Sequence, residues 1–376
     1  NCTTTTELLE HKYKDKGIRA MVSGLFMFGY MFILLPVVLY TGSLFMKSMF
    51  QLDMSLFNIA LLFAIVGAIY SIFGGLRAIA ISDTYNAIGL LVMGIIVTVL
   101  ALYAIDFDFS GIPMERLTLV GSDTSDIPWH TLLTGMIFIQ VFYWGTNMVI
   151  TQRALAAKSV KEAQKGLYAA VVLKVLLPFI VVLPGIIAFK LYGDIGDAAY
   201  GKLVGDILPP WLSGAFAAVM AGAVLSTFNS CLNSAAALYT CDIHQNYVNK
   251  NANVRNVGTK VSLVFTVVSL ALVPVYQNAT SIIALLQQLN GLYSMPVLAA
   301  FIVALGWKNI SATAIKIGLV CGVALYAFFT FVWSPFHFIH LMAITLLVTV
   351  LLTLLINKLI PNTESESEDI RVTELG

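Results

Sequence analysis

The sequence predicts an all-α polytopic membrane protein with about ten transmembrane helices. Its 376 residues are 59% hydrophobic and only 11% charged, whereas a soluble domain carries roughly 25% charged residues. Several stretches free of Asp, Glu, Lys and Arg are as long as the about 20 residues that a membrane-spanning helix needs. This composition excludes an ordinary soluble enzyme and a nucleic-acid-binding protein, and it predicts the lipid bilayer as a partner.

The charge-free stretches give the order of the spans. The first four are predicted at residues 20–46, 54–76, 84–105 and 127–152, with Asp83 separating the second from the third. The fifth covers about 166–189 and contains one charge, Lys174; the sixth lies within 207–241. Residues 261–307 and 309–357 are each long enough for two spans, with hinges near Asn278 and at Ser334-Pro335.

The distribution of basic residues predicts the orientation. An even number of spans puts both ends on one side, and Lys and Arg are enriched in cytoplasmic loops. With the N-terminus inside, 16 of the 21 Lys and Arg residues fall in internal segments, four fall outside, and Lys174 lies within the membrane. We therefore expect a membrane domain over residues 1–360 in the plasma (inner) membrane, an acidic tail over 361–376, and both ends in the cytoplasm.

Small polar residues line one face of the predicted sixth span. Ser226 and Thr227 are adjacent hydroxyls in a long charge-free stretch, and nearby Asn229, Ser230 and Asn233 fall on the same side of a helix. Such a stripe permits close packing of a second helix, or it offers neutral oxygens to a monovalent cation such as sodium. Both interpretations stay open at this point.

A second group, of polar and aromatic residues, is typical of a sugar-binding site. Gln140, Tyr143, Trp144 and Asn147 place amides and aromatic rings in the predicted fourth span, with Gly145 inside the same helix. Rings can stack on the apolar face of a sugar while amides bond its hydroxyls. The alternative for Tyr143 and Trp144 is anchoring at the membrane interface.

Three further polar side chains lie within predicted spans or at their ends. Lys174 either extends toward the cytoplasmic interface or donates hydrogen bonds to substrate hydroxyls inside a cavity. Gln287 needs a hydrogen-bond partner in lipid, which another helix or a ligand can supply. Asp83 is interpreted either as a charge at a helix N-terminus, where the helix dipole favours it, or as part of an ion exit path.

No enzyme motif accompanies these residues. The sequence has no HExxH, no P-loop and no Ser/His/Asp arrangement, and its five histidines lie at span ends without clustering. We therefore expect no catalytic activity and no metal centre.

Four blocks of sequence resemble the sodium/solute symporter family. They are IYSIFGGLRAIAISDTYNAIGLL around Gly74-Gly75 and Asp83, the block from Tyr143 to Gln152-Arg153, AVLSTFNSCLNSAAALYTCDI in the sixth span, and TELLEHKYKDKGIR near the start. Within the family the sodium–sugar branch matches best. That branch has a lysine 21 residues after the arginine of its Gln-Arg block, and Lys174 lies 21 residues after Arg153. It also has the pattern Gln-x-x-x-Gly in a core helix, which Gln287 and Gly291 match.

The resemblance implies a fold of two inverted five-helix repeats with the substrate at the midplane. It further implies that the first two core helices are absent from this chain. The implied function is sodium-coupled import of a sugar or sugar-like solute. The alternatives are a symporter for a polyol, sialic acid or an amino acid, or a membrane sensor that does not transport; amino-acid branches need no lysine at position 174.

The resemblance also implies roles for single residues. Ala223, through its carbonyl, and Ser226 and Thr227, through their hydroxyls, correspond to sodium ligands, and Asp83 to the sodium release path. Tyr143 corresponds to the aromatic inner gate. Gln140 departs from the pattern, because the sodium–sugar branch has Asn there, so the exact solute is open.

Overall fold

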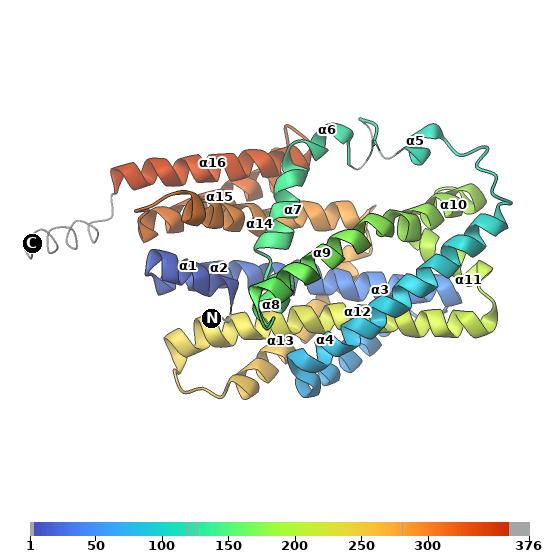
Figure 1. Ribbon diagram of the computed structural model, residues 1–376, viewed down its shortest axis with the longest axis horizontal. Helices are drawn as coiled ribbons and strands as arrows, with labels where there is room; N and C mark the ends of the chain where they lie inside the picture. Colours follow the sequence, from blue (N-terminus) through green and yellow to red (C-terminus); the bar gives the residue numbers. More distant parts are fainter. Residues whose placement is uncertain (1–3, 119, 124, 126, 280, 361–376) are drawn as a thin grey trace, which may run out of the picture.

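The structure is a computed structural model that describes residues 4–118, 120–123, 125, 127–279 and 281–360. Side chains of residues 73–80 fall outside this description, as does the predicted tail at 361–376. Every regular element in the described residues is a helix, which confirms the all-α prediction. Most of the long helices run roughly parallel to the long axis of the molecule (Figure 1).

The first half of the chain contains α1 (Thr5–Tyr13), α2 (Lys16–Gly29), the π-helical turn η1 (Tyr30–Leu34), α3 (Leu35–Phe50), α4 (Leu56–Ala104), α5 (Met114–Leu117), α6 (Trp129–Leu132), α7 (Gly135–Gly145), α8 (Met148–Leu155), α9 (Val160–Leu177), the π-helical turn η2 (Pro178–Val182) and α10 (Leu183–Tyr192). The second half contains the 3₁₀ turn η3 (Gly196–Ala198), α11 (Ala199–Ile207), α12 (Pro210–Ala237), the π-helix η4 (Leu238–Val248), α13 (Val254–Tyr276), α14 (Ile282–Gly306), α15 (Ala312–Phe331) and α16 (Phe338–Leu359).

Eight helical segments in the described residues are long and apolar enough to cross a membrane, and two shorter apolar helices cover Leu56–Ile72 and Gly135–Gly145. Several predicted boundaries are confirmed. Residues 261–307 divide into α13 and α14, and residues 309–357 divide into α15 and α16 on either side of Ser334-Pro335. The helices begin where the sequence supplies caps: the side chains of Ser159, Ser281 and Ser311 accept the first backbone N–H groups of α9, α14 and α15.

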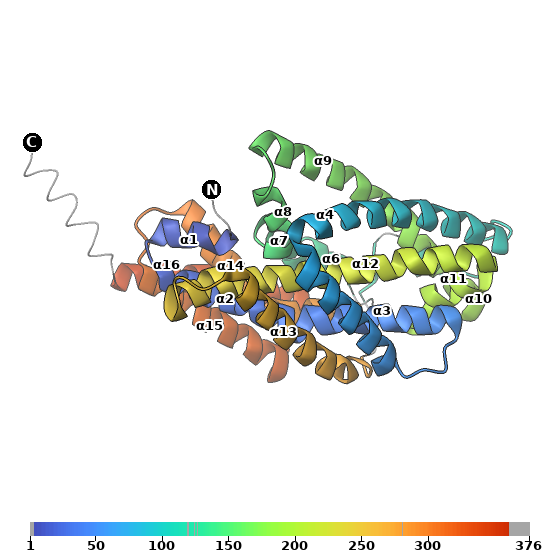
Figure 2. The same cartoon turned by 90° about the horizontal axis from the view of Figure 1, so that it is seen from below.

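The two spans predicted on either side of Asp83 are both present as apolar segments, Leu56–Ile72 and Ile81–Ala104. The helix end predicted at Asp83 is wrong, because Asp83 lies inside the continuous helix α4. A straight helix of 49 residues would measure about 74 Å, more than twice the about 30 Å of a bilayer's hydrocarbon core. Figure 2 shows that α4 bends instead, so that its two halves diverge. Asp83 is therefore not at a helix N-terminus, and stabilisation by a helix dipole does not apply to it.

The predicted single span at residues 127–152 is also wrong. Gly145 ends α7 rather than lying inside a longer helix, and α8 begins at Met148 after the extended residue Asn147. The Asn147 side chain accepts the backbone N–H of Val149 and so caps α8. A hydropathy pattern does not register this break, because no charge interrupts the apolar stretch.

Helix α12 lies at the centre of the bundle and packs against α3, α4 and α13 (Figure 2). Glycines allow this close approach: a Cβ at Gly42 would lie 2.6 Å from Val224, and one at Gly67 would lie 2.6 Å from Phe228. These contacts involve Val224 and Phe228, which lie on the other side of α12 from the small-residue face predicted for this span.

Candidate solute and ion site

Helix α7 is held in place by an aromatic cluster. The Phe142 ring stacks on Phe26 of α2 at 6.0 Å between centroids and meets Tyr293 of α14 edge-on at 5.8 Å. The Tyr30 hydroxyl donates to Asn147 at 3.0 Å. Because Phe26, Tyr30, Phe142 and Tyr293 are all buried, the position of α7 is fixed and its other face stays open.

That open face carries the predicted sugar-binding residues Gln140, Tyr143 and Trp144. The ammonium of Lys174, from α9, donates to Gln140 Oε1 at 3.2 Å and lies 4.8 Å from the centre of the Trp144 ring. Lys174 thus bonds an amide and lies over an aromatic face of another segment. Tyr143 meets Trp144 edge-on and is 43% exposed.

The other two predicted substrate residues are placed differently. Asn147 is buried, and its side-chain oxygen is shared between the Tyr30 hydroxyl and the backbone N–H of Val149. Gln287 is half-buried on α14. Among the described residues, no hydrogen bond joins Gln287 to Gln140, Tyr143 or Lys174. The structure therefore brings together Gln140, Tyr143, Trp144 and Lys174 by direct contacts, and none of these contacts includes Gln287.

The predicted sodium ligands share one turn of α12. The Thr227 hydroxyl donates to the Ala223 carbonyl at 3.0 Å, and the Ser230 hydroxyl donates to the Ser226 carbonyl at 2.8 Å. A hydroxyl that donates to a carbonyl still has lone pairs to offer. Thr227 is exposed and Ser226 is half-buried, so both hydroxyl oxygens are accessible to an ion.

Asp83 is joined to this turn through an arginine. The Arg153 guanidinium forms an ion pair with Asp83 Oδ2 and also donates to Ser230 Oγ at 2.6 Å. The second carboxylate oxygen of Asp83 is buried and has no hydrogen-bond partner in the described part of the chain. Asp83, Arg153, Ser230 and Ser226 thus form a continuous chain of polar contacts.

The neighbouring Gln152 binds the same helix. Its Oε1 accepts the Ser234 hydroxyl at 3.0 Å and the Asn233 amide at 3.5 Å. The Gln152-Arg153 pair of α8 therefore contacts the polar stripe of α12. Both features are visible in the sequence, but their contact is not.

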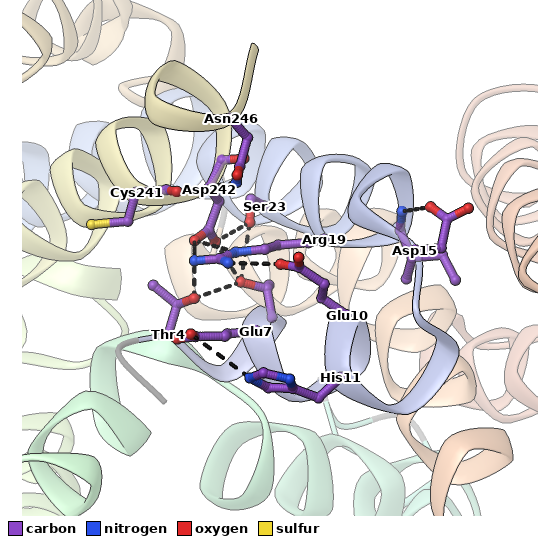
Figure 3. Close-up of polar contacts among 12 residues, drawn as sticks. Thr4, Glu7, Glu10, His11, Asp15, Arg19, Ser23, Cys241, Asp242 and Asn246 are labelled. Atoms are coloured by element: carbon purple, nitrogen blue, oxygen red, sulfur yellow. Dashed lines mark hydrogen bonds and ion pairs between the residues drawn. The ribbon is translucent and has the colours of Figure 1, made fainter. Parts of the chain in front are cut away.

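A buried ionic cluster was missed by the sequence analysis. Asp242 of η4 has a completely buried side chain and accepts hydrogen bonds from Thr4 at 3.0 Å and from Arg19 Nε at 2.8 Å (Figure 3). Ser23 and Thr6 donate to its other oxygen, and Arg19 also pairs with Glu10 at 2.7 Å. The cluster ties α1 and α2 to η4. The one available signal was an acidic residue directly after a charge-free stretch.

The histidines were expected not to cluster, and two of them do. His130 Nδ1 lies 2.7 Å from His340 Nε2, with the rings stacked at 4.8 Å, and His340 Nδ1 bonds Thr134. Residues 210 positions apart meet here, which no local pattern indicates. Over the described ranges no group of three or more His, Cys, Asp and Glu side chains is arranged to hold a metal ion.

The helical membrane fold, the polar contacts around Lys174 and those around Arg153 are typical of a transporter-like integral membrane protein. Comparison with known proteins identifies the family: the profile of the Sodium:solute symporter family matches residues 1–322. The chain belongs to this family.

Individual symporters and cotransporters are also similar to this chain in sequence. The chain is 35% identical to the uncharacterized symporter YidK of Escherichia coli K12, over 95% of this chain and 66% of that protein. It is 31% identical to the sodium/glucose cotransporter of Vibrio parahaemolyticus, over 92% of this chain and 70% of that protein. It is 28% identical to the mouse sodium/myo-inositol cotransporter 2, over 86% of this chain and 54% of that protein. The chain thus spans between about half and 70% of the length of these relatives.

A solved structure shares the fold. The substrate-bound, outward-open structure of a sodium-coupled sialic acid symporter superposes with a TM-score of 0.79 at 16% identity, over 94% of this chain and 76% of that one. The predicted transporter fold is therefore confirmed.

Proposed function

We propose that the protein is a sodium-coupled symporter that imports a sugar or a sugar-like polar solute by alternating access. The observation that carries the proposal is the position of Lys174. Its ammonium group, on the exposed helix α9 within a candidate membrane span, bonds Gln140 and lies over the Trp144 ring, and a cation in a membrane span is costly without such partners. The named relatives handle glucose and myo-inositol, which both present hydroxyl groups to such donors.

In this proposal the solute binds beside α7. Lys174 and Gln140 bond its hydroxyls, Trp144 supplies an aromatic face, and Tyr143 lies beneath the ring as the cytoplasmic gate. Asn147 contributes by fixing the break between α7 and α8, and Gln287 reaches the solute from α14. Tyr143 and Gln140 are three residues apart on α7 and so lie on one face of that helix.

Sodium, the second substrate, binds at the turn of α12 that holds Ala223, Ser226 and Thr227. The Ala223 carbonyl has a second lone pair for the ion while it accepts the Thr227 hydroxyl, and the hydroxyl oxygen keeps its own lone pairs. Asp83 lies on the release path, and its ion pair with Arg153 neutralises the arginine charge beside the proposed site. Inward movement of one sodium ion through the membrane potential contributes about 2.3 kcal/mol per 100 mV to uptake.

The proposed location is the plasma (inner) membrane, with both ends of the chain in the cytoplasm. The asymmetry of Lys and Arg along the sequence supports this orientation.

Uptake into proteoliposomes tests the function. Labelled glucose, galactose, myo-inositol and sialic acid are offered with an inward gradient of sodium or of choline. We expect at least one solute to accumulate with sodium and not with choline. Equal uptake in both salts would refute sodium coupling, and no uptake of any solute together with intact sodium binding would favour a sensor of the same fold.

A further inference from the structure

Tyr326 of α15 contacts the turn of α14 that carries Gln287. Its hydroxyl donates to the backbone carbonyl of Gln288 at 3.0 Å, and the side chain is only 1% exposed. A buried hydroxyl needs a hydrogen-bond partner, and the partner here is the residue directly after Gln287. The bond therefore ties α15 to α14 beside one of the proposed solute-binding side chains.

Gly291 makes room for the Tyr326 ring. A Cβ added at Gly291 would overlap the ring and the hydroxyl of Tyr326, so the ring lies directly on the backbone of α14. Gln287 and Gly291 are four residues apart in this helix and therefore share one of its faces. The ring thus occupies the place of a side chain one turn after Gln287. The pattern Gln-x-x-x-Gly combines a polar side chain with the gap that receives this ring.

Helix α14 needs support from its neighbours at this point. Pro296 lies inside the helix and has no backbone N–H, so the carbonyl of Leu292 lacks the hydrogen bond that the residue four positions later would give. The helical hydrogen bonding is therefore interrupted directly after Gly291. The direction of the first turns of α14, which carry Gln287, depends on contacts with neighbouring helices.

Helix α15 is itself held closely by α16. A Cβ added at Gly318 would overlap Thr353, and one added at Gly322 would overlap Thr349. The backbones of the two helices therefore approach closely, as they do at other small-residue interfaces between membrane helices. Tyr326 follows Gly322 by four residues and lies on the same face of α15. The tyrosine is thus mounted on a firmly packed helix.

We propose that Tyr326 is a positioning residue for solute recognition. Through its bond to the Gln288 carbonyl and its packing on Gly291, it holds the Gln287 amide toward the solute without touching the solute itself. The inference rests on the proposed function, in which Gln287 reaches the solute from α14. The family profile matches residues 1–322 and so does not include Tyr326.

A double-mutant cycle on solute affinity tests the inference. The probe is the solute, among labelled glucose, galactose, myo-inositol and sialic acid, that the purified parent protein binds in sodium. Tyr326→Phe keeps the ring and removes the bond to Gln288, so we expect solute affinity to fall by about fivefold, with sodium affinity measured without solute unchanged. In the Gln287→Ala background, Tyr326→Phe should cause no further loss of solute affinity, because Tyr326 acts through Gln287.

Tyr13→Phe is the matched control. The Tyr13 hydroxyl is also buried and donates to a backbone carbonyl of α14, that of Ala300, at 3.2 Å. Ala300 lies about 18 Å beyond Gln288 along the helix, so Tyr13→Phe should bind solute as the parent does. A comparable loss in this variant would show that any weakened contact to α14 lowers solute affinity, and would overturn the specific role of Tyr326.

Two further outcomes would overturn the inference while leaving the proposed function intact. One is an unchanged solute affinity in Tyr326→Phe. The other is a loss of the same size with and without Gln287, which would make Tyr326 a structural residue only. A parent protein that binds none of the four solutes would instead refute the proposed function, and the inference with it.

Discussion

The Lys174 ammonium lies 3.2 Å from the side-chain oxygen of Gln140, which comes from a different segment 34 residues away. A hydrogen bond from a charged donor contributes roughly 1.5–3 kcal/mol. The bond orients both side chains, and it leaves the ammonium with further N–H groups to donate. The pair is therefore prepared to bond a hydroxyl-rich solute.

Removing this ammonium should weaken solute binding. We expect Lys174→Ala to reduce solute affinity by about ten- to a hundred-fold, because one charge-assisted hydrogen bond is lost. Sodium binding measured without solute should change much less. The control is Lys165→Ala on the same helix, whose side chain is 62% exposed and pairs with Glu162. If Lys174→Ala binds every solute as the parent does, Lys174 has no role in recognition.

Removing either hydroxyl on α12 should weaken sodium binding. Ser226→Ala or Thr227→Ala should raise the sodium concentration for half-maximal uptake by roughly tenfold, the effect of losing an oxygen that contributes about 1.4 kcal/mol. Ser213→Ala, on the same helix with a hydroxyl that donates to the carbonyls of Leu208 and Pro209 just before the helix, serves as the control. An unchanged sodium dependence in both site variants would place the ion elsewhere.

The ion pair between Asp83 and Arg153 should show coupling in stability. Each side chain is about a quarter to a third exposed, so we expect Arg153→Gln to lower stability by only about 1–3 kcal/mol. Asp83→Asn in the Arg153→Gln background should then cost less than Asp83→Asn alone. Thermal unfolding of the four proteins in detergent gives the coupling energy. Additive effects would show that the two groups do not interact.

The buried cluster around Asp242 should dominate the stability of its end of the bundle. Asp242→Asn leaves the Arg19 charge buried with less compensation, and breaking a buried pair costs about 3–5 kcal/mol. The Arg19→Met/Asp242→Leu double variant should recover part of this loss, since it removes both charges. Glu162→Gln, which breaks an exposed pair, should lower the unfolding temperature only slightly. A small effect of Asp242→Asn would show that the cluster contributes little.

Much of the fold could be predicted from the sequence, because a bilayer imposes a length and an apolar composition on every span. The divisions between α13 and α14 and between α15 and α16 followed directly. The break between α7 and α8 did not, because it depends on the Asn147 side chain capping α8 rather than on a charge. The interior of α4 was misassigned for the opposite reason: Asp83 interrupts the apolar pattern but not the helix.

The candidate site was only partly predictable for a related reason. The residue types of Gln140, Trp144 and Lys174 indicated binding, and the structure joins them. The pairing of Arg19 with Asp242 links residues 223 positions apart, and neither residue type reveals its partner. A long-range ion pair leaves no periodic signal in a single sequence.

The most direct test of the account is thermodynamic linkage between sodium and solute. The measurement is the equilibrium affinity for the transported solute in sodium and in choline, and the affinity for sodium with and without solute. Coupled transport predicts that sodium tightens solute binding, by about 5–150-fold for a typical coupling energy, and that the solute tightens sodium binding by the same factor. Solute affinity that is identical in sodium and choline would contradict the central claim that this protein couples the two.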